Sequence, residues 1–148
     1  MSLYDPSNPV VALCAEGMQH EGEPPKARAC FERAWAARVN DFDASIAAHY
    51  LARHQATPAE TLRWNAIAMH HAEQLPAEQA VQLLPSLCLN LGDSYASVGR
   101  LAEAEIMIER ALEALSALPP DGYGEFVRGG VERLRDRVAA ARGSTLMV

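Results

Sequence analysis

The stretch of residues 91–111 constrains the fold of this chain more than any other feature. Gly92 has no side chain, so a second helix can approach its backbone closely, and Tyr95 lies three residues further on, on about the same helix face. Gly99 then suits a helix C-terminal cap, where positive φ is common. An apolar stripe at i, i+4 and i+7 follows on a second helix, formed by Ala104, Ile108 and Ala111. The stretch therefore predicts a tight antiparallel pair of helices.

The order Leu91-Gly92, Tyr95, Ala104 and Ile108 resembles the signature of the tetratricopeptide repeat (TPR), a helix-turn-helix unit of 34 residues. The resemblance implies an all-α fold in which three antiparallel helix hairpins form a right-handed superhelix. It also implies a concave face, lined by the first helix of each hairpin, that binds an extended segment of a partner.

Two further units precede this stretch. The first repeats the order of small and large side chains with Cys14-Ala15, Met18, Gly22, Ala27, Phe31 and Ala34. Alanine there replaces the first glycine, and methionine replaces the tyrosine. The middle unit is marked by a capping box with proline at the first helical position, Thr57-Pro58-Ala59-Glu60. This start places Thr61 one 34-residue period after Ala27.

A single TPR-like domain is therefore predicted over residues 1–148, with repeats at about 9–41, 42–75 and 78–117 and a C-terminal capping helix at 122–141. Individual helices are expected at about 9–21, 24–38, 42–55, 58–73, 78–98, 101–117 and 122–141. Thr61 and Ala104 are 43 residues apart, nine more than the 34-residue period. This excess predicts a loop near Pro76 and a lengthened next helix. Pro85 should kink that helix or begin a new one. Residues after Arg142 are expected to fray.

Composition excludes several classes of function. The net charge is −6 and no basic run occurs, so no nucleic acid partner is expected. The longest apolar runs are too short to span a bilayer, no signal peptide is visible, and so no membrane partner is expected. Three cysteines at no metal-like spacing indicate buried thiols in a reducing, cytoplasmic setting, namely Cys14, Cys30 and Cys88. No catalytic, metal or cofactor motif occurs, which predicts a non-enzymatic protein without cofactors.

The repeat register assigns a set of candidate groove residues: Glu16, Gln19, His20, His49, Tyr50, Arg53, His54, Asn90 and Asp93. Arg53 can make a forked contact to a carboxylate or phosphate, and Tyr50 combines an aromatic body with a polar tip. By the resemblance, Asn90 would hydrogen-bond the backbone of a bound peptide. The alternative is an ordinary polar helix face, with Arg53 paired to Glu16 or Asp93.

His49 and the two tryptophans each allow two interpretations. His49 stands where the repeat has a small residue, so it is either a core histidine with a hydrogen-bond partner such as Asn65 or a group that orients the groove. Trp35 and Trp64 either pack between adjacent hairpins or form an exposed contact surface.

The sequence thus predicts an interaction module that holds a peptide or protein segment in its concave groove. Two alternatives stay open. One is a self-assembling subunit that forms a homodimer through its repeat ends. The other is a sensor of a small anionic ligand, with a pocket formed by His49, Tyr50, Arg53 and Asn90.

Overall fold

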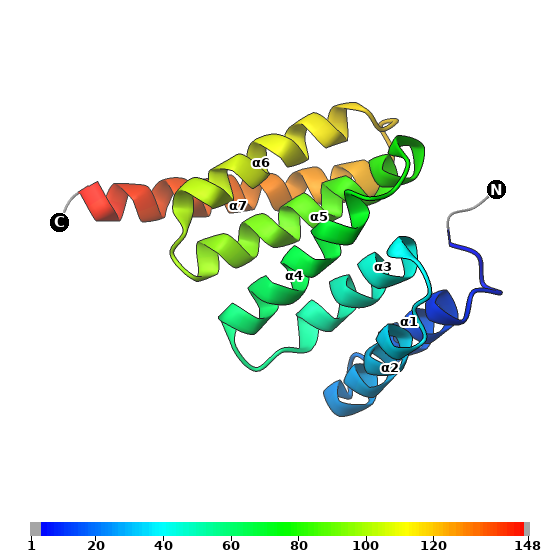
Figure 1. The fold of residues 1–148 in the computed structure, drawn as a ribbon. Coiled ribbons are helices and arrows are strands. Elements are labelled where there is room, and N and C mark those ends of the chain that lie inside the picture. The colour runs from blue at the N-terminus through cyan, green and yellow to red at the C-terminus, as the bar shows by residue number, and fades with distance from the viewer. Residues whose placement is uncertain (1–3, 147–148) are drawn as a thin grey trace. The chain divides into compact units, whose positions relative to one another are not determined.

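The structure is a computed structural model that describes the backbone of residues 4–146 and the side chains of residues 4–144. These residues form an all-α protein without strands (Figure 1). Its helices are α1 (Pro9–Gln19), α2 (Pro24–Ala36), α3 (Asp41–Leu51), α4 (Pro58–Ala72), α5 (Ala77–Ser97), α6 (Leu101–Ser116) and α7 (Gly122–Leu146), with a short 3₁₀ turn η1 (Ala52–His54).

The predicted start and stop signals of the helices are confirmed. The Thr57 hydroxyl caps α4 by accepting a hydrogen bond from the Glu60 N–H at 3.2 Å. Gly99 has a φ of 81° at the end of α5. There the Arg100 N–H donates to the Tyr95 carbonyl at 2.9 Å, and the Gly99 N–H donates to the Ala96 carbonyl at 3.1 Å. This pair of bonds is a Schellman motif, which needs a left-handed residue at the position of Gly99.

Two helix ends differ clearly from the sequence prediction. The helix expected to reach residue 55 ends as an α-helix at Leu51 and tightens into η1, a common form of helix terminus. The final helix does not end at residue 141 but continues to Leu146, so the prediction of fraying after Arg142 is wrong for residues 143–146. Residues 147–148 lie outside the described part of the chain. Pro85 begins no new helix, because α5 runs through it as one helix.

The chain divides into two compact units, residues 1–79 and residues 80–148. In the first unit, α1 and α2 form one antiparallel hairpin and α3 and α4 form a second, as Figure 1 shows. Helix α3 also packs against both α1 and α2. The predicted apolar stripe of α2 lies in the core of this unit, with Ala27, Phe31 and Ala34 all 0% exposed.

The close approach of α1 to α2 occurs at Gly17 rather than at the predicted Ala15. A Cβ atom added to Gly17 would lie 2.4 Å from the Cε1 atom of Phe31, so only glycine leaves room for that ring. Ala15 is exposed, and Met18, expected to take the place of a packed tyrosine, is 49% exposed. The large Phe31 ring therefore moves the close contact two residues along α1.

A buried polar cluster joins the beginnings of α1 and α3. Asp43 is 1% exposed, and its Oδ1 atom accepts a hydrogen bond from the Asn8 side-chain amide at 2.9 Å. Asn8 also caps α1 by accepting from the Val10 N–H at 2.8 Å. The second Asp43 oxygen accepts from the Val39 N–H at 3.1 Å. Because both oxygens have partners, this carboxylate can be buried, and it fixes the first turns of the two helices beside each other.

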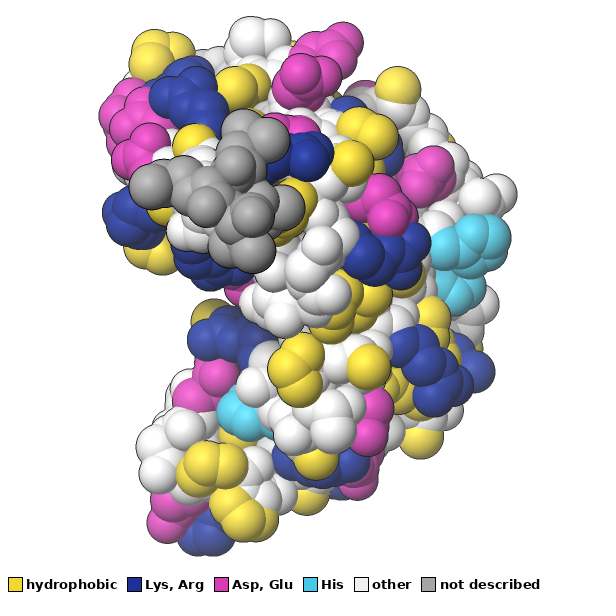
Figure 2. Space-filling model, turned by 90° about the vertical axis from the view of Figure 1, so that its left-hand side faces the viewer, with side chains coloured by type: hydrophobic (Ala, Val, Ile, Leu, Met, Phe, Trp, Pro, Cys, Tyr) yellow, Lys and Arg dark blue, Asp and Glu magenta, His cyan; other side chains and the backbone are white. Residues whose placement is uncertain are grey.

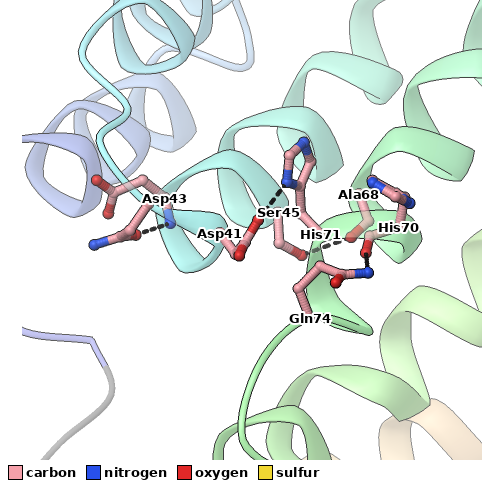
Figure 3. A network of polar contacts seen from close by, with 8 residues as sticks. Asp41, Asp43, Ser45, Ala68, His70, His71 and Gln74 are labelled. Atoms are coloured by element: carbon pink, nitrogen blue, oxygen red, sulfur yellow. Dashed lines mark hydrogen bonds and ion pairs between the residues drawn. The ribbon is translucent and has the colours of Figure 1, made fainter.

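Helices α3 and α4 meet through small side chains and two polar contacts (Figure 3). The buried Ser45 hydroxyl donates to the Ala68 carbonyl at 2.9 Å, and the His71 ring lies 2.8 Å from an Asp41 oxygen. Four alanines that are 0% exposed allow the close packing, namely Ala47, Ala48, Ala68 and Ala72.

The second unit contains most of α5 together with α6 and α7. A Cβ on Gly92 would lie 3.1 Å from both Met107 of α6 and Leu134 of α7, which confirms that this glycine permits a close approach. The apolar stripe of α7 is buried, with exposures between 0% and 4% at Val127, Val131, Leu134 and Val138. Helix α7 thus covers the apolar faces of α5 and α6.

Gly17→Ala should destabilise the protein by about 1–3 kcal/mol, because the added methyl group overlaps the ring of Phe31. Urea unfolding followed by far-UV circular dichroism measures this loss. Gly22→Ala is the matched control, since nothing lies within 4 Å of its added Cβ. Equal stability of the two variants would contradict the contact.

Candidate functional site

The best-formed polar cluster of the first unit lies where α1 and η1 end beside each other. Glu21 follows α1, and its Oε1 atom lies 3.1 Å from Nη2 of Arg53. Its Oε2 atom lies 3.2 Å from Nε2 of His54. One carboxylate therefore holds two consecutive side chains of η1. Since the Asn8–Asp43 bond joins the beginnings of α1 and α3, these two helices run side by side in the same direction.

An aromatic layer supports this cluster. The Tyr50 ring stacks on the buried Phe31 ring, with centroids 5.2 Å apart and planes 16° apart. The His54 ring lies 5.4 Å from the same Phe31 ring, and the Arg53 guanidinium lies 5.8 Å from the Tyr50 ring. Tyr50 and His54, about one helical turn apart, thus both pack against one side chain of α2. Tyr50, Arg53 and His54 lie together in this cluster.

His49 is half-buried beside this cluster, and its ring stays neutral over a wide pH range. Burial lowers its pKa from 6.5 to about 4, and the positive charge of Arg53 adds to the shift. The ring packs edge-on against Tyr50, with centroids 5.1 Å apart. A neutral, packed ring fits the structural interpretation of His49 better than direct contact with a ligand.

The remaining predicted groove residues are less closely associated. Glu16 and Gln19 lie exposed on α1, and His20 at its end is half-buried, 3.8 Å from a Glu23 oxygen. Asn90 and Asp93 belong to the second unit.

In that unit Asp93 forms an ion pair with Arg137 of α7 at 2.7 Å, and Asn90 is half-buried on α5. Asp93 is thus bound by the capping helix of its own unit.

Glu21 is the site residue that sequence reasoning missed. The sequence offered Glu16 or Asp93 as partners of Arg53, but the partner is Glu21. The repeat register considers helix positions only, whereas Glu21 stands in the turn after α1. A usable signal was its distance of 33 residues from His54, close to one period.

The site is suited to non-covalent recognition. Arg53 is 48% exposed, and its partly exposed ion pair with Glu21 stabilises the fold by about 1 kcal/mol. Arg53 can therefore exchange Glu21 for the carboxylate of a bound molecule at small cost. On the face drawn in Figure 2, acidic and basic side chains lie among hydrophobic ones, so no large area there carries one sign of charge.

The cysteine thiols lie in the core, away from the candidate site's surface. The three cysteines are buried free thiols, as predicted. Burial raises the pKa of Cys14 to about 12, with a further contribution from the Asp43 carboxylate. This thiol stays protonated and is a poor nucleophile. Within the described residues, no group of three or more His, Cys, Asp or Glu side chains is arranged to hold a metal ion.

The tryptophans pack against each other between successive hairpins, as one of the two interpretations expected. Trp35 of α2 and Trp64 of α4 meet edge to face, with ring centroids 5.0 Å apart. Both remain half-buried, so part of each ring faces solvent.

Comparison of the chain with models of protein families, with curated proteins and with solved structures gives no match. Across the part of the chain that the structure describes, no helix has the length and apolar character needed to cross a bilayer.

His49 should make stability depend on pH between 6.5 and 4. In this window the unfolded chain takes up a proton that the folded chain excludes, so the free energy of unfolding falls as the pH falls. The loss from this residue is at most about 3 kcal/mol, from the size of the pKa shift.

Urea unfolding at a series of pH values tests this. His49→Gln should flatten the slope, and His70→Gln, at an exposed position of α4, should leave it unchanged. Equal slopes in wild type and His49→Gln would contradict the assignment.

Proposed function

We propose that this chain is a short TPR-like array whose α1–α3 face binds an extended peptide or protein segment without covalent chemistry. In this proposal the three hairpins are repeats of a right-handed superhelix and α7 is the capping helix. The observation that carries the proposal is the parallel alignment of α1 and α3. First helices of successive hairpins lie side by side in this way in stacked helical repeats, where they form a continuous binding face.

The cluster of Glu21, Arg53 and His54 gives this face a specific recognition element. Arg53 offers a planar donor that carboxylates bind in a forked geometry, and the stacked Tyr50 ring beside it offers apolar contact. Tyrosine and arginine are enriched among residues that dominate binding energy at protein interfaces. Because Phe31 holds the Tyr50 ring in place, little side-chain entropy is lost when a partner binds.

Arg53→Ala should weaken binding of a peptide to this face by about tenfold or more, because the forked contact is lost. The probes are twelve-residue peptides selected on wild-type protein from a random display library and measured by fluorescence anisotropy. Circular dichroism should show unchanged helicity, since a partly exposed ion pair contributes little to the fold.

Arg28→Ala is the matched control. Arg28 lies on α2 and forms a similar exposed pair with Glu32 at 2.9 Å, so its removal changes the net charge equally. Binding should stay within about twofold of wild type. The proposal fails if selection enriches no peptide, or if every selected peptide binds Arg53→Ala and wild type equally well.

A further inference from the structure

A second aromatic and basic surface lies on α2, α4 and the residues that follow α2. The Arg38 guanidinium carbon lies 3.9 Å from the centre of the Trp35 ring. Trp35 meets Trp64 at 5.0 Å, and the Arg63 guanidinium lies 6.0 Å from the Trp64 ring. These four side chains form a continuous row, Arg38–Trp35–Trp64–Arg63, which we call the tryptophan row.

The arginines of the tryptophan row are positioned but not neutralised. Arg38 stacks on Trp35 and also donates a hydrogen bond to its carbonyl at 2.7 Å, so its guanidinium is held in one orientation. Among the residues that the structure describes, neither Arg38 nor Arg63 forms an ion pair with a carboxylate. The acidic group nearest in the chain to Arg38, Asp41, is held by His71 at 2.8 Å.

The row has the composition of a binding hot spot. Tryptophan and arginine are the residues most enriched at such positions, and both tryptophans here are half-buried with part of each ring in solvent. Val39, next to Arg38, is 85% exposed and adds apolar surface. The row thus combines apolar rings at its centre with a positive charge at each end.

We propose that the tryptophan row is a docking surface for an acidic segment of a partner protein, with apolar side chains on the rings and carboxylates on Arg38 and Arg63. Charge complementarity favours this occupant, because both ends of the row are unpaired cations. A single-stranded nucleic acid is a poorer fit, since the edge-to-face packing leaves no open pair of parallel ring faces and the net charge of the protein is −6.

This surface is separate from the α1–α3 face of the proposed function. It uses the second helices of the two hairpins, and Arg38 and Arg63 take no part in the cluster of Glu21, Arg53 and His54. Either surface can therefore fail its test without affecting the other.

Intrinsic fluorescence reads out this surface directly, because Trp35 and Trp64 are the only two tryptophans of the chain. The probe is a synthetic twelve-residue peptide of leucines flanked by glutamates, without tryptophan. The expected result is a saturable change in tryptophan emission. The matching peptide with glutamine in place of glutamate should bind at least about tenfold more weakly, because it lacks the carboxylates.

Single substitutions test whether the arginines of the tryptophan row, rather than other cations of the protein, bind the acidic peptide. Arg38→Gln and Arg63→Gln should each weaken binding of the acidic peptide severalfold, whereas Arg28→Gln, on the same helix as Trp35, should leave its affinity unchanged. No saturable change in emission, equal affinity for the two peptides, or full affinity in both Arg38→Gln and Arg63→Gln would each overturn the proposal.

Two other occupants are tested with the same signal. Stronger binding of a ten-nucleotide oligothymidylate than of the acidic peptide would overturn the proposal in favour of a nucleic acid. An emission shift with protein concentration alone, accompanied by dimers in sedimentation velocity, would overturn it in favour of a second copy of this chain.

Discussion

The packing of the Phe31 ring is the interaction on which the first unit depends. The ring is 0% exposed and lies between a glycine of α1 and the end of α3. On one side Gly17 provides the space for it, and on the other Tyr50 stacks upon it. A single side chain of α2 therefore sets the distance from α2 to both of its neighbours. Protein interiors are packed so closely that adding or removing one methyl group at such a contact changes the stability of the fold.

The candidate site follows from this contact. Tyr50 and His54 both lie against Phe31, and Arg53 stands between them in the chain on η1. Arg53 and His54 are consecutive residues of η1, and both reach the Glu21 carboxylate. The buried Asn8–Asp43 bond fixes the other end of the same pair of helices. Apolar packing and two polar contacts together align α1 with α3.

Local signals in the sequence predicted the elements well. Proline at the first helical position, the Thr57 cap and the left-handed Gly99 act within a few residues, so they can be read without knowledge of the fold. The helix period likewise predicted the buried stripes of α2 and α6. The end of α7 was misplaced because a glycine directly after Arg142 is a common stop signal, whereas α7 continues through Gly143 to Leu146.

Contacts between helices were harder to predict. The repeat alignment placed the close approach of α1 at Ala15, but the size of the Phe31 ring requires it at Gly17. Glu21 was missed as the partner of Arg53 because a turn residue has no fixed register in a helical repeat. Which side chains meet across two helices depends on their axial offset, and this is set by large core residues rather than by the period.

A double-mutant cycle between Phe31 and Tyr50 tests the central claim most directly. Phe31→Leu, Tyr50→Leu and the double variant are unfolded in urea, and the coupling free energy is taken from the four stabilities. Stacked rings should give a coupling of about 0.5–1.5 kcal/mol, because each substitution removes the same contact. Additive losses, with a coupling below about 0.3 kcal/mol, would show that α2 and α3 do not depend on this stack.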